Sequence, residues 1–113
     1  NDAPVPPAKV YTLVVEVGRS ADDGLPEGAT GAGLVCYATG ADEAEAVRET
    51  VAVLRQAGLA PLDVTGYGTL AERLAEGHEI AAEESRLMER AAAENAVIVA
   101  QVTPFHDDEG SAG

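Results

Sequence analysis

The sequence predicts a single α+β domain, an α/β sandwich in which a four-stranded sheet carries its helices on one face. Three observations support this fold class. Four segments read as strands, three segments read as helices, and the elements follow in the order β-β-α-β-α-α-β. Two strand-helix-strand connections within 113 residues favour two layers, one of strands and one of helices.

The first two predicted strands form a hairpin. Residues 10–17 (VYTLVVEV) alternate between two faces, and residues 32–39 (AGLVCYAT) form a second apolar run. The intervening residues 18–31 are rich in glycine, proline and aspartate, which is typical of a loop. We therefore expect a hairpin with a long acidic connection.

The first helix is predicted between Thr39 and Gly58. Thr39 is a suitable N-cap, and Gly58 occupies the position where a C′ glycine is expected. The apolar residues recur at three- and four-residue spacing and form one stripe: Ala44, Val47, Val51 and Leu54. We expect this stripe to pack on the sheet.

A short strand and a short helix follow. Residues 62–67 form the strand, and Thr69 with Glu72 forms a capping box that opens a helix ended by Gly77. Because signals for both ends stand so close together, we expect a helix of only a few residues.

The last helix and the last strand complete the predicted fold. The helix runs from Glu79 to about Glu94, with one apolar and one charged side. Residues 96–103 (AVIVAQVT) are almost continuously apolar, which predicts the central strand, and Pro104 ends it. The βαβ-like units resemble those of ferredoxin-like domains in general character, a likeness of fold that implies no function.

Both termini are predicted to lie outside the domain. Residues 1–8 contain three prolines and predict an extended arm, residues 9–105 form the single domain, and residues 106–113 (HDDEGSAG) predict an acidic flexible tail. The first residue is Asn1 rather than Met, which is compatible with removal of a preceding segment.

Composition limits the possible partners. The formal net charge is −13, with Lys9 as the single lysine, so we expect no nucleic acid to bind. A basic protein partner is compatible with this charge. No apolar run approaches the roughly 18 residues that span a bilayer, so we expect no membrane contact. The single Cys36 excludes an intramolecular disulfide, and a cytoplasmic location is expected.

The sheet face opposite the predicted helix layer is unusually apolar. Five of its residues are expected to form one contiguous patch: Val14, Val35, Tyr37, Val97 and Val99. Monomers seldom expose a large apolar patch, so this one predicts a homodimer interface. Two alternatives stay open. Either the loop over residues 18–31 covers the face, or the face is a platform for a small ligand with Tyr37, Tyr67 and Gln101 as polar groups.

A second candidate site lies where the third strand meets the short helix. The segment TGYGT contains two glycines, which allow a ligand to approach backbone N–H groups at a helix start. The predicted ligand-binding residues are Gly66, Tyr67, Gly68, Thr69 and Tyr37. The alternative is an ordinary strand-to-helix turn that needs flexible residues and a cap.

No catalytic or metal-binding motif is recognisable. His78 and Glu79 begin an H-E-I-A-A segment that lacks the second histidine of a zinc protease helix. Cys36 lies on the predicted core side of a strand, which favours an inert thiol. The segment from His106 to Glu109 offers acidic ligands, but a flexible tail does not hold them in place. We therefore expect no catalytic residue, no metal and no cofactor.

The sequence thus predicts a non-enzymatic assembly or binding module that self-associates through its sheet face. Two alternatives belong to other classes. One is an acidic inhibitor or immunity-type protein that neutralises a basic partner. The other is a small-ligand sensor or enzyme whose site lies at the turn over residues 65–69.

Overall fold

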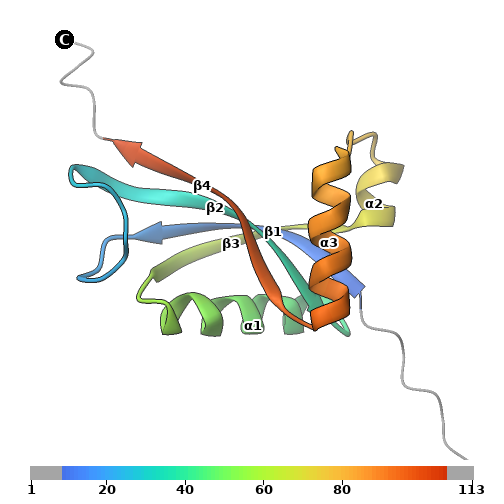
Figure 1. The fold of residues 1–113 in the computed structure, drawn as a ribbon, viewed down its shortest axis with the longest axis horizontal. Coiled ribbons are helices and arrows are strands. Elements are labelled where there is room, and N and C mark those ends of the chain that lie inside the picture. The colour runs from blue at the N-terminus through green and yellow to red at the C-terminus, as the bar shows by residue number, and fades with distance from the viewer. Residues whose placement is uncertain (1–8, 107–113) are drawn as a thin grey trace, which may run out of the picture.

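The computed structural model describes residues 9–106. Their strands and helices follow one another in the predicted order (Figure 1). The predicted arm over residues 1–8 and the predicted tail after His106 lie outside the described residues. His106 itself belongs to the last strand. The elements are β1 (Lys9–Gly18), β2 (Ala29–Gly40), α1 (Glu43–Gln56), β3 (Ala60–Thr69), α2 (Leu70–Ala75), α3 (Ala82–Glu94) and β4 (Val97–His106).

The strands form one antiparallel sheet with the order β3-β1-β2-β4. β1 and β2 form the predicted hairpin at its centre, with Leu13 opposite Cys36. The prediction that the last strand is central is wrong, because β4 pairs with β2 alone and lies at an edge. The edge position also explains why Pro104, which has no N–H to donate, is accommodated inside β4 instead of ending it.

The helices cover both faces of the sheet, so the prediction of a single helical face is wrong. Leu54 of α1 packs with Cys36 of β2, whereas Met88 of α3 packs with Tyr37 of the same strand. Successive residues of a strand point to opposite faces, so α1 and α3 lie on opposite sides of the sheet (Figure 1). We call these sides the α1 face and the α3 face. The two-layer arrangement does not form, and the ferredoxin-like character is not confirmed.

The α1 face holds the larger core. Thr50 of α1 is buried there and donates its hydroxyl hydrogen to the carbonyl of Ala46 at 2.8 Å, so the helix satisfies its own buried polar group. The buried apolar side chains on this face are Tyr11, Leu13, Val15, Val17, Ala32, Leu34, Cys36, Ala38, Ala46 and Leu54.

The start of α1 differs from the prediction. Its N-cap is Asp42, whose carboxylate accepts the N–H of Glu45 at 2.9 Å. Thr39 lies in β2 and donates its hydroxyl hydrogen to the carbonyl of Ala91 in α3 at 2.9 Å. Thr39 therefore fastens the end of β2 to the helix on the other face.

The loop between β1 and β2 docks on the α1 side. Leu25 packs against the α1-face core, and the Ser20 hydroxyl donates to the carbonyl of Gly58, just after α1. Arg19 donates to the carboxylate of Asp23 at 2.8 Å, which holds the loop on itself. The loop contributes no residue to the cavity on the α3 face that is described below. Among the described residues, no helix has the length and apolar composition needed to cross a bilayer.

Candidate ligand-binding site

An open cavity of about 450 Å³ lies between the α3 face of the sheet and α3 itself. We call it the α3 cavity. Its volume falls within the range of ordinary small-molecule sites. All four strands, both helices on this side and the segment between those helices contribute to its wall. The lining residues are Thr12, Val14, Val35, Tyr37, Tyr67, Arg73, His78, Ala81, Glu83, Glu84, Leu87, Ala100 and Gln101.

The cavity exists because the two ends of α3 differ in character. Met88 and Ala91 are buried against Tyr37 and anchor the later part of the helix to the sheet. The first turn carries Glu83 and Glu84, which favour the positive end of the helix dipole and are unsuited to a dry core. The beginning of α3 therefore leaves the space beside it open.

Arg73 of α2 is the centre of a hydrogen-bond network in this cavity. Its side chain is only 12 % exposed. The guanidinium donates through Nη1 to Thr12 Oγ1 at 3.1 Å and to Glu84 Oε1 at 3.4 Å. Its Nε donates to His78 Nδ1 at 3.1 Å. One cation thus joins β1, α2, α3 and the segment between the helices, and its rigid fork holds these groups in a defined arrangement.

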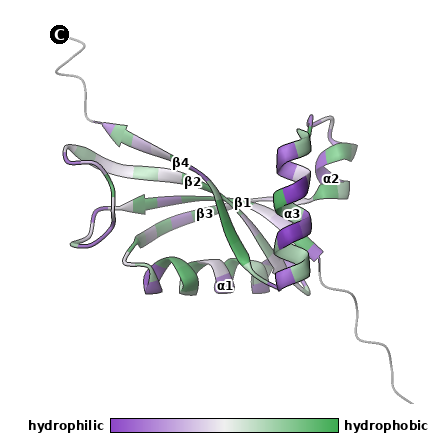
Figure 2. Cartoon of the chain, viewed as in Figure 1, coloured by the Kyte–Doolittle hydropathy of each residue, from purple (hydrophilic) through white to green (hydrophobic). Residues whose placement is uncertain are grey.

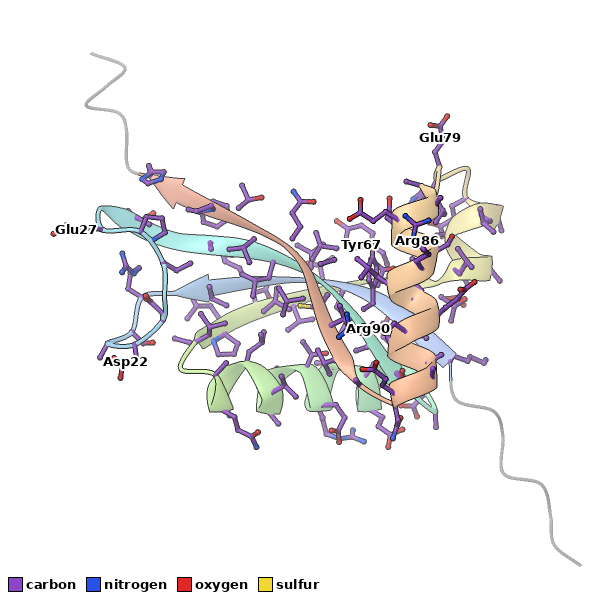
Figure 3. All side chains as sticks on the ribbon, viewed as in Figure 1. Asp22, Glu27, Tyr67, Glu79, Arg86 and Arg90 are labelled. Atoms are coloured by element: carbon purple, nitrogen blue, oxygen red, sulfur yellow. The ribbon has the colours of Figure 1, made fainter. Side chains whose placement is uncertain are left out.

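His78 and Tyr67 form the outer part of the cavity wall. Because His78 Nδ1 accepts a hydrogen bond from Arg73, its ring hydrogen is on Nε2, which lies 3.7 Å from Glu76 Oε1. The rings of Tyr67 and His78 have centroids 6.5 Å apart with a tilted interplanar angle of 59°. Figure 3 shows Tyr67 beside α3. The two rings offer an aromatic surface next to the polar network.

Tyr37 forms the inner end of the network. Its hydroxyl donates to Glu84 Oε1 at 3.0 Å, and its side chain lies beneath α3. Burial, together with the neighbouring Glu84 carboxylate, raises the pKa of Tyr37 to about 12. Tyr37 therefore remains a neutral hydrogen-bond donor at any physiological pH. Glu84 accepts from both Tyr37 and Arg73, so its carboxylate is well satisfied.

Two hydroxyl groups of this cavity and the single thiol of the chain are held in their protonated forms or engaged in hydrogen bonds. The Tyr37 hydroxyl donates to the Glu84 carboxylate, but its raised pKa keeps it protonated, and the Thr12 hydroxyl oxygen accepts from Arg73. Cys36 lies on the α1 face, where burial raises its pKa to about 11 and keeps the thiol protonated. Within residues 9–106 no group of three or more His, Cys, Asp or Glu side chains is placed to hold a metal ion.

The predicted turn over residues 65–69 is strand rather than turn, because β3 continues to Thr69. Gly66 pairs with Leu13, and the space where its Cβ would stand is occupied by the carboxylate of Glu43. The space beside Gly68 is occupied in the same way by Glu72. Glutamate side chains therefore cover both glycines on the side where a Cβ would stand.

The predicted capping box is confirmed and engages two of the amide groups at the start of the helix. The N–H of Thr69 donates to Glu72 Oε1 at 2.8 Å, and the N–H of Glu72 donates to Thr69 Oγ1 at 3.2 Å. Of the predicted ligand residues, only Tyr67 and Tyr37 line the α3 cavity. Gly66 and Gly68 of β3, together with Glu72, line a separate hollow.

The structure divides the five residues of the predicted interface patch between two faces. Val14, Val35 and Tyr37 lie on the α3 face, and all three line the cavity. Val97 and Val99 lie on the α1 face, opposite Ala38 and Cys36. The set does not form one patch.

A β-bulge explains this division. The pairing of β2 with β4 shifts between Val35 and Cys36, so Ala100 is an extra residue in β4. Inserting one residue reverses which side chains of the rest of the strand share a face. Tyr37, expected on an open face, is only 2 % exposed because α3 covers it.

The acidic side chains do not gather on one surface. Exposed glutamates occur on α1 and on α3, which lie on opposite faces. Figure 3 shows Asp22 and Glu27 at one end of the molecule and Glu79 at the other. An inhibitor that presents carboxylates to a basic enzyme needs them concentrated, so this spread does not favour that alternative.

These observations define the class of protein: an α+β domain with a four-stranded antiparallel sheet, helices against both of its faces, and one open cavity beside α3. A family model described as a domain of unknown function (DUF8846) matches residues 10–106, from the beginning of β1 to the end of β4. The chain belongs to this family. No curated protein and no solved structure matches it.

Sequence reasoning identified part of this site and missed its centre. Tyr37, Tyr67 and Gln101 were expected as polar groups of a ligand platform, and all three line the cavity. Arg73 and Glu84 were not expected. The only local signal for Arg73 was a basic residue within a very short helix, and its partner Thr12 is 61 residues away.

Proposed function

We propose that this domain binds a small, largely apolar molecule that carries at least one hydrogen-bonding group, and that the ligand occupies the α3 cavity. The observation that carries the proposal is the convergence of Thr12, Tyr37, Arg73 and Glu84 on one cavity from separate elements. Ligand pockets are typically concave and contain a few polar groups that are held in fixed positions beside apolar surfaces.

The apolar part of the ligand is expected to lie on the sheet. Val14, Val35 and Ala100 provide an apolar floor, and Leu87 of α3 faces them across the cavity. Tyr67 lies at the rim with an exposed ring, where it is available to pack on a flat ligand. Removing these surfaces from water supplies most of the expected binding free energy.

The charges in the cavity favour a neutral or cationic ligand over a polyanion. Arg73 is its one arginine or lysine, and that guanidinium is already engaged with Glu84. Glu83 adds a further carboxylate, and the whole chain has a net charge of −13. A nucleotide or a polyphosphate would meet repulsion on approach.

A thermal-shift screen of neutral, cationic and anionic small molecules tests the proposal. A ligand present at 100 times its Kd stabilises the native state by about 2.7 kcal/mol, which corresponds to roughly 10 °C in Tm for a domain of this size. We expect such a shift for the wild type and a much smaller one for Tyr67→Ala. Leu62→Ala is the matched control, because Leu62 is an exposed apolar residue of the same strand outside the cavity.

The position of binding is checked separately by amide chemical shifts. Perturbations should cluster at Val14, Val35, Tyr67 and Ala100, and they should be weak on α1. A ligand that perturbs α1 alone, or one whose stabilisation is unchanged in Tyr67→Ala, would place binding elsewhere. A broad screen with no stabilising compound in any charge class would contradict the proposal.

A further inference from the structure

The two edges of the sheet are built differently. β3, at one edge, carries the charged Asp63 as well as Pro61. Charge, proline and bulges are the features by which proteins protect an open strand edge from pairing with another chain. β4, at the other edge, also has a proline, Pro104, and a bulge at Ala100, but it contains no charged residue from Val97 to Phe105.

β4 also exposes apolar side chains along its length. Val99 and Val102 are 40 % and 48 % exposed, and both lie on the α1 face, opposite Cys36 and Leu34. Phe105 is similarly exposed near the end of the strand, over Gly33. Figure 2 shows the first half of β4 in green, whereas α3 beside it is largely purple. β4 has no partner strand on its outer side within residues 9–106.

We propose that β4 is a self-association edge, at which the β4 strands of two copies of this chain pair antiparallel and join their sheets. Unpaired backbone N–H and C=O groups along an edge are satisfied by another strand. A two-fold axis perpendicular to the sheet keeps like faces together, so Val99 and Val102 of both copies lie on the same face of the joined sheet.

The distribution of charge indicates that the strand pairing with β4 comes from a second copy of this chain. Two chains of net charge −13 repel each other, and a homotypic contact is stable only where both surfaces are uncharged. The β4 edge meets this condition, because any antiparallel register over residues 97–103 brings only uncharged side chains together. A basic partner, by contrast, would be attracted to the glutamates of α1 and α3.

Sedimentation equilibrium of the full chain tests this proposal directly. We expect a dimer at high micromolar concentration, and we expect Val102→Glu to weaken its formation by at least about 100-fold, because it places like charges across the two-fold axis. Leu62→Glu is the control. It adds the same charge at an exposed apolar position on the opposite edge, and the dimer should persist. A monomeric wild type, or a dimer lost equally in both variants, would overturn the proposal.

Hydrogen exchange on the unmodified chain removes the dependence on a variant that folds. Amides of β4 whose N–H groups point outward should exchange more slowly at high than at low protein concentration, and amides of β3 should not change. Protection that rises in β3, or does not depend on concentration in β4, would overturn the assignment. The Val102→Glu result counts only if its circular dichroism and cooperative thermal unfolding match the wild type.

Discussion

The two faces of the sheet use the same strands for different purposes. On the α1 face, Leu54 and Cys36 belong to an apolar core, and the buried hydroxyl of Thr50 is satisfied inside its own helix. On the α3 face, Tyr37 and Arg73 belong to a polar network that borders an open cavity. The first arrangement is an apolar core, whereas the second leaves an open space bordered by polar groups.

Under the proposed function, the two faces separate stability from binding. Interiors are close-packed, so a cavity of about 450 Å³ represents contacts that the α3 face does not make. A chain of this length has one main core to stabilise it, and here that core lies beneath α1. The α3 face can then carry buried polar groups without unfolding the protein.

The largest expected effect comes from truncating matched leucines on the two faces. Leu54→Ala should lower the free energy of unfolding by about 3 kcal/mol, because it leaves a cavity in a closed core. Leu87→Ala, at a half-buried position on the cavity wall, should cost about 1 kcal/mol. Urea unfolding measures both. Equal costs would show that the α3 face is packed as tightly as the α1 face.

The next effect concerns the buried cation. Arg73→Met should lower the free energy of unfolding by about 2 kcal/mol, since it leaves Thr12 and Glu84 without their charged donor. Arg90→Met is the control, because Arg90 is exposed and pairs only with Glu94 in the next turn. That change should cost less than about 0.5 kcal/mol. A cost for Arg73→Met as small as the control would mean that the network does not hold α2 and α3 in place.

The smallest effect is an alkaline titration that distinguishes the two faces. The pKa of Cys36 is raised from 9.0 to about 11 on the α1 face, and that of Tyr37 is raised from 10.0 to about 12 on the α3 face. In both cases the group loses its proton at a lower pH in the unfolded chain than in the folded one. The free energy of unfolding is therefore at its full value below the unfolded-state pKa, and it falls as the pH rises towards the folded-state pKa. Each group should account for a loss on the order of 1 kcal/mol in the free energy of unfolding over this pH range.

Variants separate the two contributions. Cys36→Ala should flatten the loss of stability between pH 9 and 11, and Tyr37→Phe should flatten it between pH 10 and 12. Chemical unfolding at a series of pH values measures the slopes. If Tyr37→Phe left the profile unchanged, Tyr37 would be more hydrated than its place beneath α3 implies.

Local signals predicted most of the elements and some of the caps. The hairpin of β1 and β2, the capping box of Thr69 and Glu72, and the order of all elements follow from residues close together in the chain. Thr39 shows the limit of such reasoning. Its residue type suits an N-cap, but its hydroxyl bonds to Ala91, 52 residues away, and Asp42 caps the helix.

The sequence by itself determined the α+β class and the alternation of apolar residues along the strands, because propensity, periodicity and capping act over a few neighbouring residues. Only the tertiary structure decided which face each helix covers, that β4 is an edge, and that a bulge at Ala100 separates Val97 and Val99 from Val14 and Val35. Those features depend on strand pairing and helix packing between distant segments. A single inserted residue changes the face on which the following side chains of a strand lie, and it leaves no signal in the neighbouring sequence.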